Sequence, residues 1–304
     1  MRPPPPPRAD NIPLAAAALL AAVFALSLGD ALVKKFNATF TLWQIFILRS
    51  LMAAPLLALF LKMQNAPLLP RRLAWGGLRA ALLALMWLVY YISLLHLPLS
   101  AAAAVWYTTP IIIVLLAAMF LGGRVGARGW GAVLLGFCGV LLILRPRAGD
   151  FNPWALLPLL AALLYAFAMI ITRMHCRDEH PLALALALHL AYIALGAAGF
   201  AGTFAVREFA PEFFGGGFLS PEWRALGAAE IAVMGALAAA ALVGSIGAAV
   251  AYILAPPAVV APFDFAYLAF TAVWSVLLFA DFPDAAGALG IVAITAAGLL
   301  ALRR

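Results

Sequence analysis

Long apolar segments alternate with short polar ones along the whole chain. Runs of about 20 mostly apolar residues are the length that a helix needs to cross a lipid bilayer, and here they end at charged residues, proline or glycine. The weakest boundary falls in "YILAPPAVVAPFDF", which has prolines but no charge before Asp264. The pattern predicts ten spanning helices, at residues 13–33, 40–61, 73–95, 100–121, 128–144, 153–172, 181–206, 228–254, 258–280 and 285–302.

The composition supports an integral membrane protein. Hydrophobic residues make up 67% of the 304 residues and charged residues only 10%, whereas a soluble domain is about half apolar and a quarter charged. The net charge of +7 does not indicate a nucleic-acid partner, because Lys and Arg stand in small groups between apolar runs. Cys138 and Cys176 are far apart, so the chain has neither a CxxC pair nor a disulfide framework.

The loop charges predict the orientation in the membrane. With the N-terminus inside, inner segments carry 11 Lys and Arg and outer segments carry six, so the positive-inside rule places both termini in the cytoplasm. Residues 1–12 are a Pro-rich tail. A cleaved signal peptide is disfavoured because the first apolar run continues as far as Asp30 and ends at Lys34 and Lys35.

The chain also contains an internal repeat. "GAVLLGFCGVLLILR" (131–145) aligns with "GIVAITAAGLLALRR" (290–304) at an offset of 159 residues, and near the start of each half the offset is closer to 139. An outer insertion at 207–227 accounts for the difference. Each half, 13–145 and 152–304, has five spans, and this odd number requires opposite insertion. We therefore expect one domain of two inverted repeats around a central cavity, the arrangement typical of secondary transporters.

Aromatic side chains concentrate in the third and fourth spans. Trp87 and Tyr91 are four residues apart on one helix face, with Tyr90 beside them; Trp106 and Tyr107 precede Thr108, Thr109 and Pro110. Proline has no N–H, so the carbonyl of Trp106 is left free, which a membrane tolerates where protein or a wet cavity satisfies it. The cluster either lines the cavity or packs around a kink, and we favour the cavity.

The second half adds further candidates for substrate binding, Tyr165, Ser245 and Tyr267. Three charged or titratable residues within the predicted spans form a separate group. Arg49 either contacts a substrate carboxylate or bonds to backbone carbonyls. His189, its approximate counterpart in the repeat, either titrates or is a core histidine. Asp264 is the first candidate for proton coupling, ahead of Asp30 and Glu230 near span ends.

The order of these motifs resembles the drug/metabolite transporter superfamily, in particular its ten-helix members with two EamA-type repeats. The family usually has Glu after the fourth helix, where this chain has Gly122 or Gly123, while the second half keeps Asp281. The resemblance implies a bacterial inner-membrane protein, similar in look to exporters of aromatic and neutral amino acids. The residues that carry it are "ALVKK", "FILRSLMAAPLL", "HLPLSAAAAVWYTTPIIIVLLAAMFLGG", "GAVLLGFCGVLLI" and "FADFPDAAGALGIVAITAAGLL".

Three classes of function remain to be compared. A secondary transporter that exports small metabolites, with amino acids as the leading class and other metabolites or drugs as the alternative, fits the repeat and the clustered polarity. An intramembrane enzyme would need a convergent catalytic group, and the chain has no HExxH or GxSxG motif. A channel would repeat polar positions along a whole pore face. The sequence predicts no cofactor, metal or direct use of ATP, and leaves proton coupling and oligomeric state open.

Overall fold

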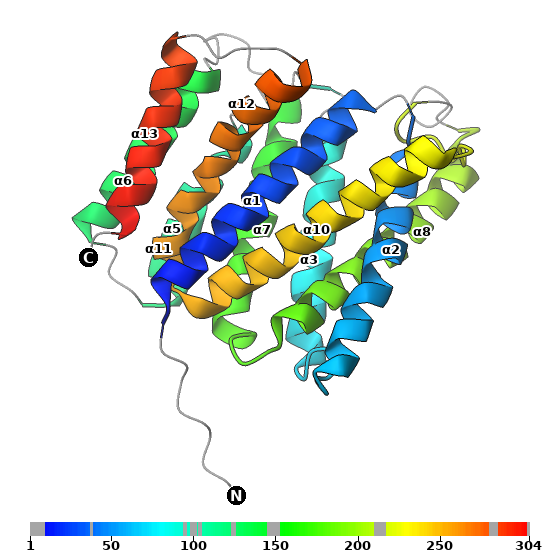
Figure 1. Cartoon of the computed structure of the whole chain (residues 1–304), viewed down its shortest axis with the longest axis horizontal. Helices are drawn as coiled ribbons and strands as arrows, with labels where there is room; N and C mark the ends of the chain where they lie inside the picture. The colour runs from blue at the N-terminus through cyan, green and yellow to red at the C-terminus, as the bar shows by residue number, and fades with distance from the viewer. Residues whose placement is uncertain are drawn as a thin grey trace, which may run out of the picture.

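Every regular element of the structure is helical within the residues that it describes (Figure 1). The computed structural model describes residues 10–36, 39–93, 96–97, 102, 105–122, 126–144, 153–209, 217–279 and 285–302. Most of the predicted tail, Gly123, Asp281, and residues 210–216 of the insertion lie outside these ranges. Ten helices of at least twelve residues lie within them: α1 (Ile12–Lys35), α2 (Leu42–Met63), α3 (Leu73–Ser93), α5 (Thr109–Phe120), α6 (Ala127–Leu144), α7 (Leu156–His175), α8 (Pro181–Val206), α10 (Ala228–Leu254), α12 (Ala266–Phe279) and α13 (Ala285–Leu302).

Several helices begin at residues whose side chains satisfy the free N–H groups of a first turn. Asn11 accepts a hydrogen bond from the Leu14 amide at the start of α1. At the start of α2, Thr41 and Gln44 form a reciprocal capping box. Pro181 opens α8, where its fixed φ suits the first helical position. These caps lie at the predicted boundaries, to within two residues.

Two of the predicted spans are more broken than the apolar pattern indicated. Within 100–121, the continuous helix α5 begins only at Thr109. The span predicted at 258–280 consists of a short α11 (Pro257–Val260), a 3-10 turn η2 (Ala261–Phe265) and then α12. Pro257 and Pro262 each lack an N–H, so regular α-helical bonding is interrupted beside Asp264.

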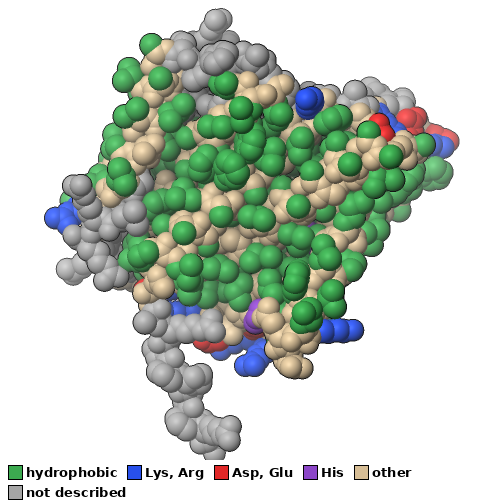
Figure 2. Space-filling view, in the orientation of Figure 1, with side chains coloured by type: hydrophobic (Ala, Val, Ile, Leu, Met, Phe, Trp, Pro, Cys, Tyr) green, Lys and Arg blue, Asp and Glu red, His purple; other side chains and the backbone are tan. Residues whose placement is uncertain are grey.

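The surface of the helices is suited to lipid. Seven segments of the described chain are long and apolar enough to cross a membrane, and α5, α6 and α13 are shorter apolar helices. Large apolar side chains are exposed along the spans, among them Leu51, Leu59, Phe60 and Leu277. Figure 2 shows hydrophobic side chains over the middle of one face, with charged side chains near its edges. The protein is therefore a multi-pass, all-helical membrane protein.

The helices pack in pairs drawn from opposite halves of the chain. α1 lies along α10, α3 along α7, α2 along α8, and α6 along α13 (Figure 1). Two of these pairs approach closely because a glycine leaves room. A Cβ on Gly247 of α10 would lie 2.6 Å from the carbonyl oxygen of Ala18, and one on Gly139 of α6 would lie 2.7 Å from that of Gly290. The core thus joins the two halves along their whole length.

Candidate functional site

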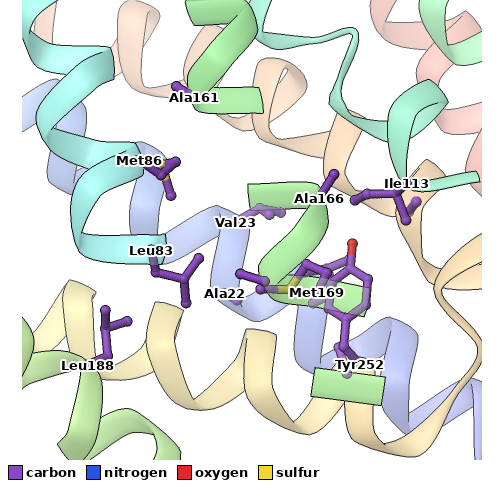
Figure 3. Packing of buried hydrophobic residues seen from close by; sticks show 14 of the residues in the cluster. Ala22, Val23, Leu83, Met86, Ile113, Ala161, Ala166, Met169, Leu188 and Tyr252 are labelled. Carbon is purple, nitrogen blue, oxygen red and sulfur yellow. The ribbon is translucent and has the colours of Figure 1, made fainter. Parts of the chain in front are cut away.

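A continuous group of aromatic rings lies between the helices of the main core. This aromatic cluster, as we call it, contains residues from α3, the segment just before α5, α7, α10 and α12: Trp87, Tyr90, Tyr91, Trp106, Tyr107, Tyr165, Tyr252 and Tyr267. Figure 3 shows Tyr252 of α10 beside Ala166 and Met169 of α7 and Ile113 of α5, all members of the same buried cluster. The structure thereby brings together seven of the eight residues predicted to bind substrate.

The ring contacts run from the first half of the chain into the second. Trp87 and Tyr91 stack with centroids 5.3 Å apart, and Tyr90 lies 5.3 Å from Trp106. Trp106 then lies 5.8 Å from Tyr165 of α7. These offset and edge-on contacts are the geometries that aromatic pairs prefer. Trp106 and Tyr165 therefore form one of the ring contacts that join the two halves.

Two carboxylates border the aromatic cluster and accept hydrogen bonds from its tyrosines. Asp264 accepts from the hydroxyl of Tyr252 at 2.7 Å and from that of Tyr165 at 3.4 Å. Asp30 of α1 accepts from the hydroxyl of Tyr267 of α12. Asp30 is therefore not merely an acid at a helix end, as its position in the sequence suggested. Both acids are bound by neutral hydroxyl donors.

The carbonyl freed by Pro110 has a protein partner. The hydroxyl of Thr109 donates a hydrogen bond to the Trp106 carbonyl, and the hydroxyl of Thr108 donates to the Val105 carbonyl at 2.7 Å. Protein therefore satisfies this carbonyl, which is one of the two possibilities that the sequence left open. The two threonine hydroxyls thus replace backbone hydrogen bonds that are missing before Pro110, and this positions Trp106 before α5 begins.

Arg49 and His189 meet on the facing surfaces of α2 and α8. The guanidinium carbon of Arg49 lies 4.9 Å from the ring centroid of Tyr192, a cation–π contact. His189 is buried, and its Nδ1 lies 3.2 Å from the hydroxyl of Ser50, while its Nε2 has no described hydrogen-bond partner. Two sequence candidates from opposite halves thus share one helix interface, which packs against the aromatic cluster through Phe46.

The structure adds Arg79, a residue that the sequence argument did not single out. Its side chain is 1% exposed on α3, and its Nε donates to the Thr172 hydroxyl of α7 at 2.7 Å. Nη1 and Nη2 have no hydrogen-bond partner among the described residues. A central charge costs roughly 2.5–3.5 kcal/mol on insertion scales. The inner and outer loop counts cover 17 of the 19 Lys and Arg; Arg49 and Arg79 are the other two, which is the signal that would have found Arg79.

The hydroxyl of Ser245, the eighth predicted binding residue, bonds to its own helix. It donates to the Leu242 carbonyl at 3.2 Å. Leu242 and Ile246, on either side, pack against the apolar cluster between α2 and α8. The described contacts of Ser245 therefore do not join it to the aromatic rings. Among the described residues, no three His, Cys, Asp or Glu side chains are grouped so that they could hold a metal ion.

One end of the protein, which we call the basic end, is closed by polar contacts around loops 64–72 and 176–180. Asp10 bridges Arg173 and Arg177 at 2.6 and 2.9 Å, and Arg173 also donates to the Ile253 carbonyl at 2.9 Å. Buried Glu179 accepts from the backbone N–H groups of Arg71 and Arg72, both at 2.8 Å. These contacts tie α1, α3, α7 and α10 together.

The opposite end is closed by the described part of the insertion, residues 217–227. The indole N–H of Trp43 donates to the Leu219 carbonyl at 3.1 Å, and the Gln44 side chain donates to the Arg224 carbonyl at 2.7 Å. The ring of Phe218 lies 5.9 Å from that of Tyr91, so the insertion reaches the aromatic cluster. The cluster consequently lies between two ends that are both held by specific contacts.

Comparison with known proteins finds a family model that matches part of the chain. Residues 13–145, which hold nearly all of α1, the helices from α2 to α6 and five of the eight residues of the aromatic cluster, match the EamA-like transporter family. The match is to transporters rather than enzymes, in agreement with the absence of catalytic motifs from the sequence. A solved crystal structure superposes with a TM-score of 0.76 over 95% of both chains at 16% identity, which shows that the two chains share a fold.

The curated relatives of this chain are named for different compounds. A riboflavin transporter of Rhizobium johnstonii is 34% identical over 40% of this chain and 41% of its own length. The pseudopaline exporter CntI of Pseudomonas aeruginosa is 27% identical over 52% and 56%. An S-adenosylmethionine uptake transporter of Rickettsia bellii is 33% identical over 25% and 26%. The chain thus aligns with about a quarter to a half of each relative.

Proposed function

We propose that the protein is a secondary transporter of small metabolites that works by alternating access. The observation that carries this proposal is the contact between Trp106 and Tyr165, because it joins the two halves through side chains suited to binding. In secondary transporters with repeats, the substrate site lies near the midplane where the halves meet. Since both ends of the cluster are tied, a substrate would enter or leave only after one set of contacts opens.

The inverted repeat is part of this proposal, and the helix pairing supports it. In the proposed repeat, α3 corresponds to α10 and α7 corresponds to α1. The pair α3–α7 therefore corresponds to the pair α10–α1, and both pairs are present. The pairs α2–α8 and α6–α13 exchange with themselves, as helices on a two-fold axis must. Ser50 and His189 are equivalent at the offset of 139, and they contact each other. Residues related by a two-fold axis touch only where they lie close to it.

The substrate class that the aromatic cluster fits best is a planar aromatic metabolite with polar substituents. Rings bind by offset or edge-on contact, and tyrosine hydroxyls and carboxylates can hold hydroxyl or amine groups. Riboflavin and S-adenosylmethionine, named for two of the relatives, are both molecules of this type. Aromatic amino acids, the class predicted from the sequence resemblance, are smaller members of the same chemical class and remain a second candidate.

Direction, membrane and energy source complete the proposal. The loop charges favour both termini in the cytoplasm of a bacterial inner membrane, and α1 begins on the same side as α13 ends (Figure 1). Export is the direction predicted from the resemblance, whereas the relatives include both an exporter and uptake transporters. Asp264 is proposed as the group that couples transport to protons, since it is the carboxylate bound to the cluster by two tyrosines.

Counterflow in proteoliposomes tests this function. Vesicles that contain the purified protein are loaded with unlabelled riboflavin, S-adenosylmethionine, tryptophan or alanine, and entry of the same labelled compound is followed. We expect transient accumulation of at least one planar aromatic compound and little for alanine. Empty vesicles provide the baseline. Equal counterflow for all four compounds, or none for any, would reject the proposed substrate class.

A further inference from the structure

Two arginines in the interior are not paired with an acid among the described residues. Arg49 on α2 is 8% exposed and its Nε has no hydrogen-bond partner; Arg79 on α3 is 1% exposed and both its Nη atoms lack one. The acids that border the aromatic cluster bond to tyrosines instead. The interior therefore contains guanidinium N–H groups that have no hydrogen-bond partner among the described residues.

Both arginines lie on one side of the aromatic cluster. The guanidinium carbon of Arg49 lies 4.9 Å from the ring centroid of Tyr192 of α8. Tyr192 joins the cluster through Phe46, with centroids 5.3 Å apart, and Phe46 continues to Tyr91 at 6.2 Å. Thr172, which accepts from Arg79, lies on α7, the helix that also carries Tyr165. The positive field is consequently adjacent to the rings that would hold a substrate.

Arg79 is oriented as a binding group. Its Nε donates to the Thr172 hydroxyl, which is itself fixed by donating to the Ala168 carbonyl at 2.7 Å. This bond holds the plane of the guanidinium and leaves the edge formed by Nη1 and Nη2 free. Two parallel N–H donors on such an edge match the two oxygens of a carboxylate or phosphate. A lysine at this position would lack that two-point geometry.

We propose that Arg79 binds an anionic group, a carboxylate or a phosphate, of a metabolite whose aromatic ring lies on the aromatic cluster. This inference rests on the proposed function. Arg79 and Trp87 are eight residues apart on α3, about 12 Å along the axis at 1.5 Å per residue. A ligand with its ring at Trp87 and its anionic group at Arg79 would extend along α3. The substrate is therefore an extended aromatic anion, and Arg49 adds to the attractive field.

The surroundings of Arg79 indicate when the anion would reach it. One helical turn nearer the basic end, Trp75 stacks on His175 with centroids 3.7 Å apart. This stack joins α3 to the last residue of α7, and the Arg79 side chain is buried in this conformation. Opening of the basic end would expose the free edge of the guanidinium. Arg79 thus belongs to the alternating-access path rather than to the closed interior alone.

The first experiment measures anion binding without transport. The melting temperature of the purified protein is followed with acetate against acetamide, and with phosphate against chloride at equal ionic strength. We expect acetate or phosphate to raise it, Arg79→Gln to abolish that rise, and the exposed Arg128→Gln to preserve it. No anion-specific rise in the wild type, or an equal rise in Arg79→Gln, would overturn the inference. Comparison of acetate with phosphate shows whether the site prefers a carboxylate or a phosphate group.

The second experiment compares riboflavin with riboflavin 5′-phosphate, which differ only in the anion. We expect the wild type to prefer the phosphate and Arg79→Gln to reduce that preference about tenfold, with riboflavin itself little affected. If Arg79→Gln does not fold, Thr172→Val is used, because it removes the hydroxyl that orients the guanidinium. Riboflavin transport without any phosphate preference would overturn the inference and leave the proposed function intact.

Discussion

Tyr252 and Asp264 lie on consecutive spans, and the hydroxyl of Tyr252 donates a 2.7 Å hydrogen bond to the Asp264 carboxylate. Between them stand Pro256, Pro257 and Pro262, and α10 ends at Leu254 before the short α11 and the 3-10 turn η2. The break places a carboxylate within a span, next to tyrosines from two helices. A negative charge at this depth is costly, and uptake of a proton removes that cost.

Asp264→Asn should abolish the dependence of transport on a pH gradient and leave substrate exchange in place. The amide keeps the shape of the side chain but cannot release a proton, so exchange without net proton movement continues. The measurement is labelled-substrate uptake with and without an imposed gradient, with the exposed Asp178→Asn as control. If the pH dependence of Asp264→Asn equals that of the wild type, Asp264 is structural.

Replacement of a ring at the junction of the halves should change substrate preference. Trp106→Ala or Tyr165→Ala removes contact area and a ring pair worth about 0.5–1.5 kcal/mol, and each 1.4 kcal/mol corresponds to tenfold in affinity. We expect transport of bulky aromatic substrates to fall several-fold relative to small ones. The exposed Trp223→Ala, outside the aromatic cluster, is the matched control. An unchanged ratio between substrates, at equal protein level, would make both rings packing residues.

Close packing of α6 on α13 should make Gly139 intolerant of even one methyl group. A Cβ there would lie 2.7 Å from the Gly290 carbonyl oxygen, a rigid backbone atom. Overpacking of this kind costs about 1–3 kcal/mol. Gly235→Ala in α10 meets nothing within 4 Å and should be neutral or slightly stabilising. Melting temperatures in detergent compare the two, and equal values would mean that α6 and α13 separate easily.

Cys176 should report opening of the basic end. It is buried beside loop 176–180, and burial, opposed by the charge of Arg79, raises the pKa of its thiol to about 11. Relative to a thiol of pKa 9.0, it carries roughly a hundredfold less of the reactive thiolate near neutral pH. In a Cys138→Ser background, N-ethylmaleimide should therefore react slowly at pH 7.5 and faster as the pH rises towards 11.

Glu179→Gln should accelerate this labelling. It replaces the carboxylate that accepts from the Arg71 and Arg72 amides at the start of α3, so the basic end opens more often. The raised pKa of the Cys176 thiol also predicts that the stability of the folded protein falls between about pH 9 and 11, because the thiol ionises first in the unfolded chain. Labelling of Glu179→Gln at the wild-type rate would show that these bonds do not hold the end closed.

Helix positions and the membrane environment followed from local information. Length and apolar content of a segment are enough for a helix to span a bilayer, because its backbone bonds are all internal. The caps at Asn11 and Thr41, and the proline that opens α8, are likewise readable along the chain. The tyrosines and tryptophans could be recognised from local sequence too, because aromatic residues that are spaced one helical turn apart lie on one helix face whatever packs against it.

Contacts between residues that are distant in the sequence depend on how the helices pack, and two such contacts, together with one local hydrogen bond, did not follow from the sequence pattern. The pattern marked Pro110 as a source of a free carbonyl, but only the folded chain shows the Thr109 hydroxyl in position to bond it. Asp30 resembled an interfacial acid until α12 brought Tyr267 to it. Arg79 gained meaning only beside Thr172, 93 residues away. Apolar periodicity specifies which face of a helix is buried, whereas the residues that contact that face are set by how the helices pack against one another.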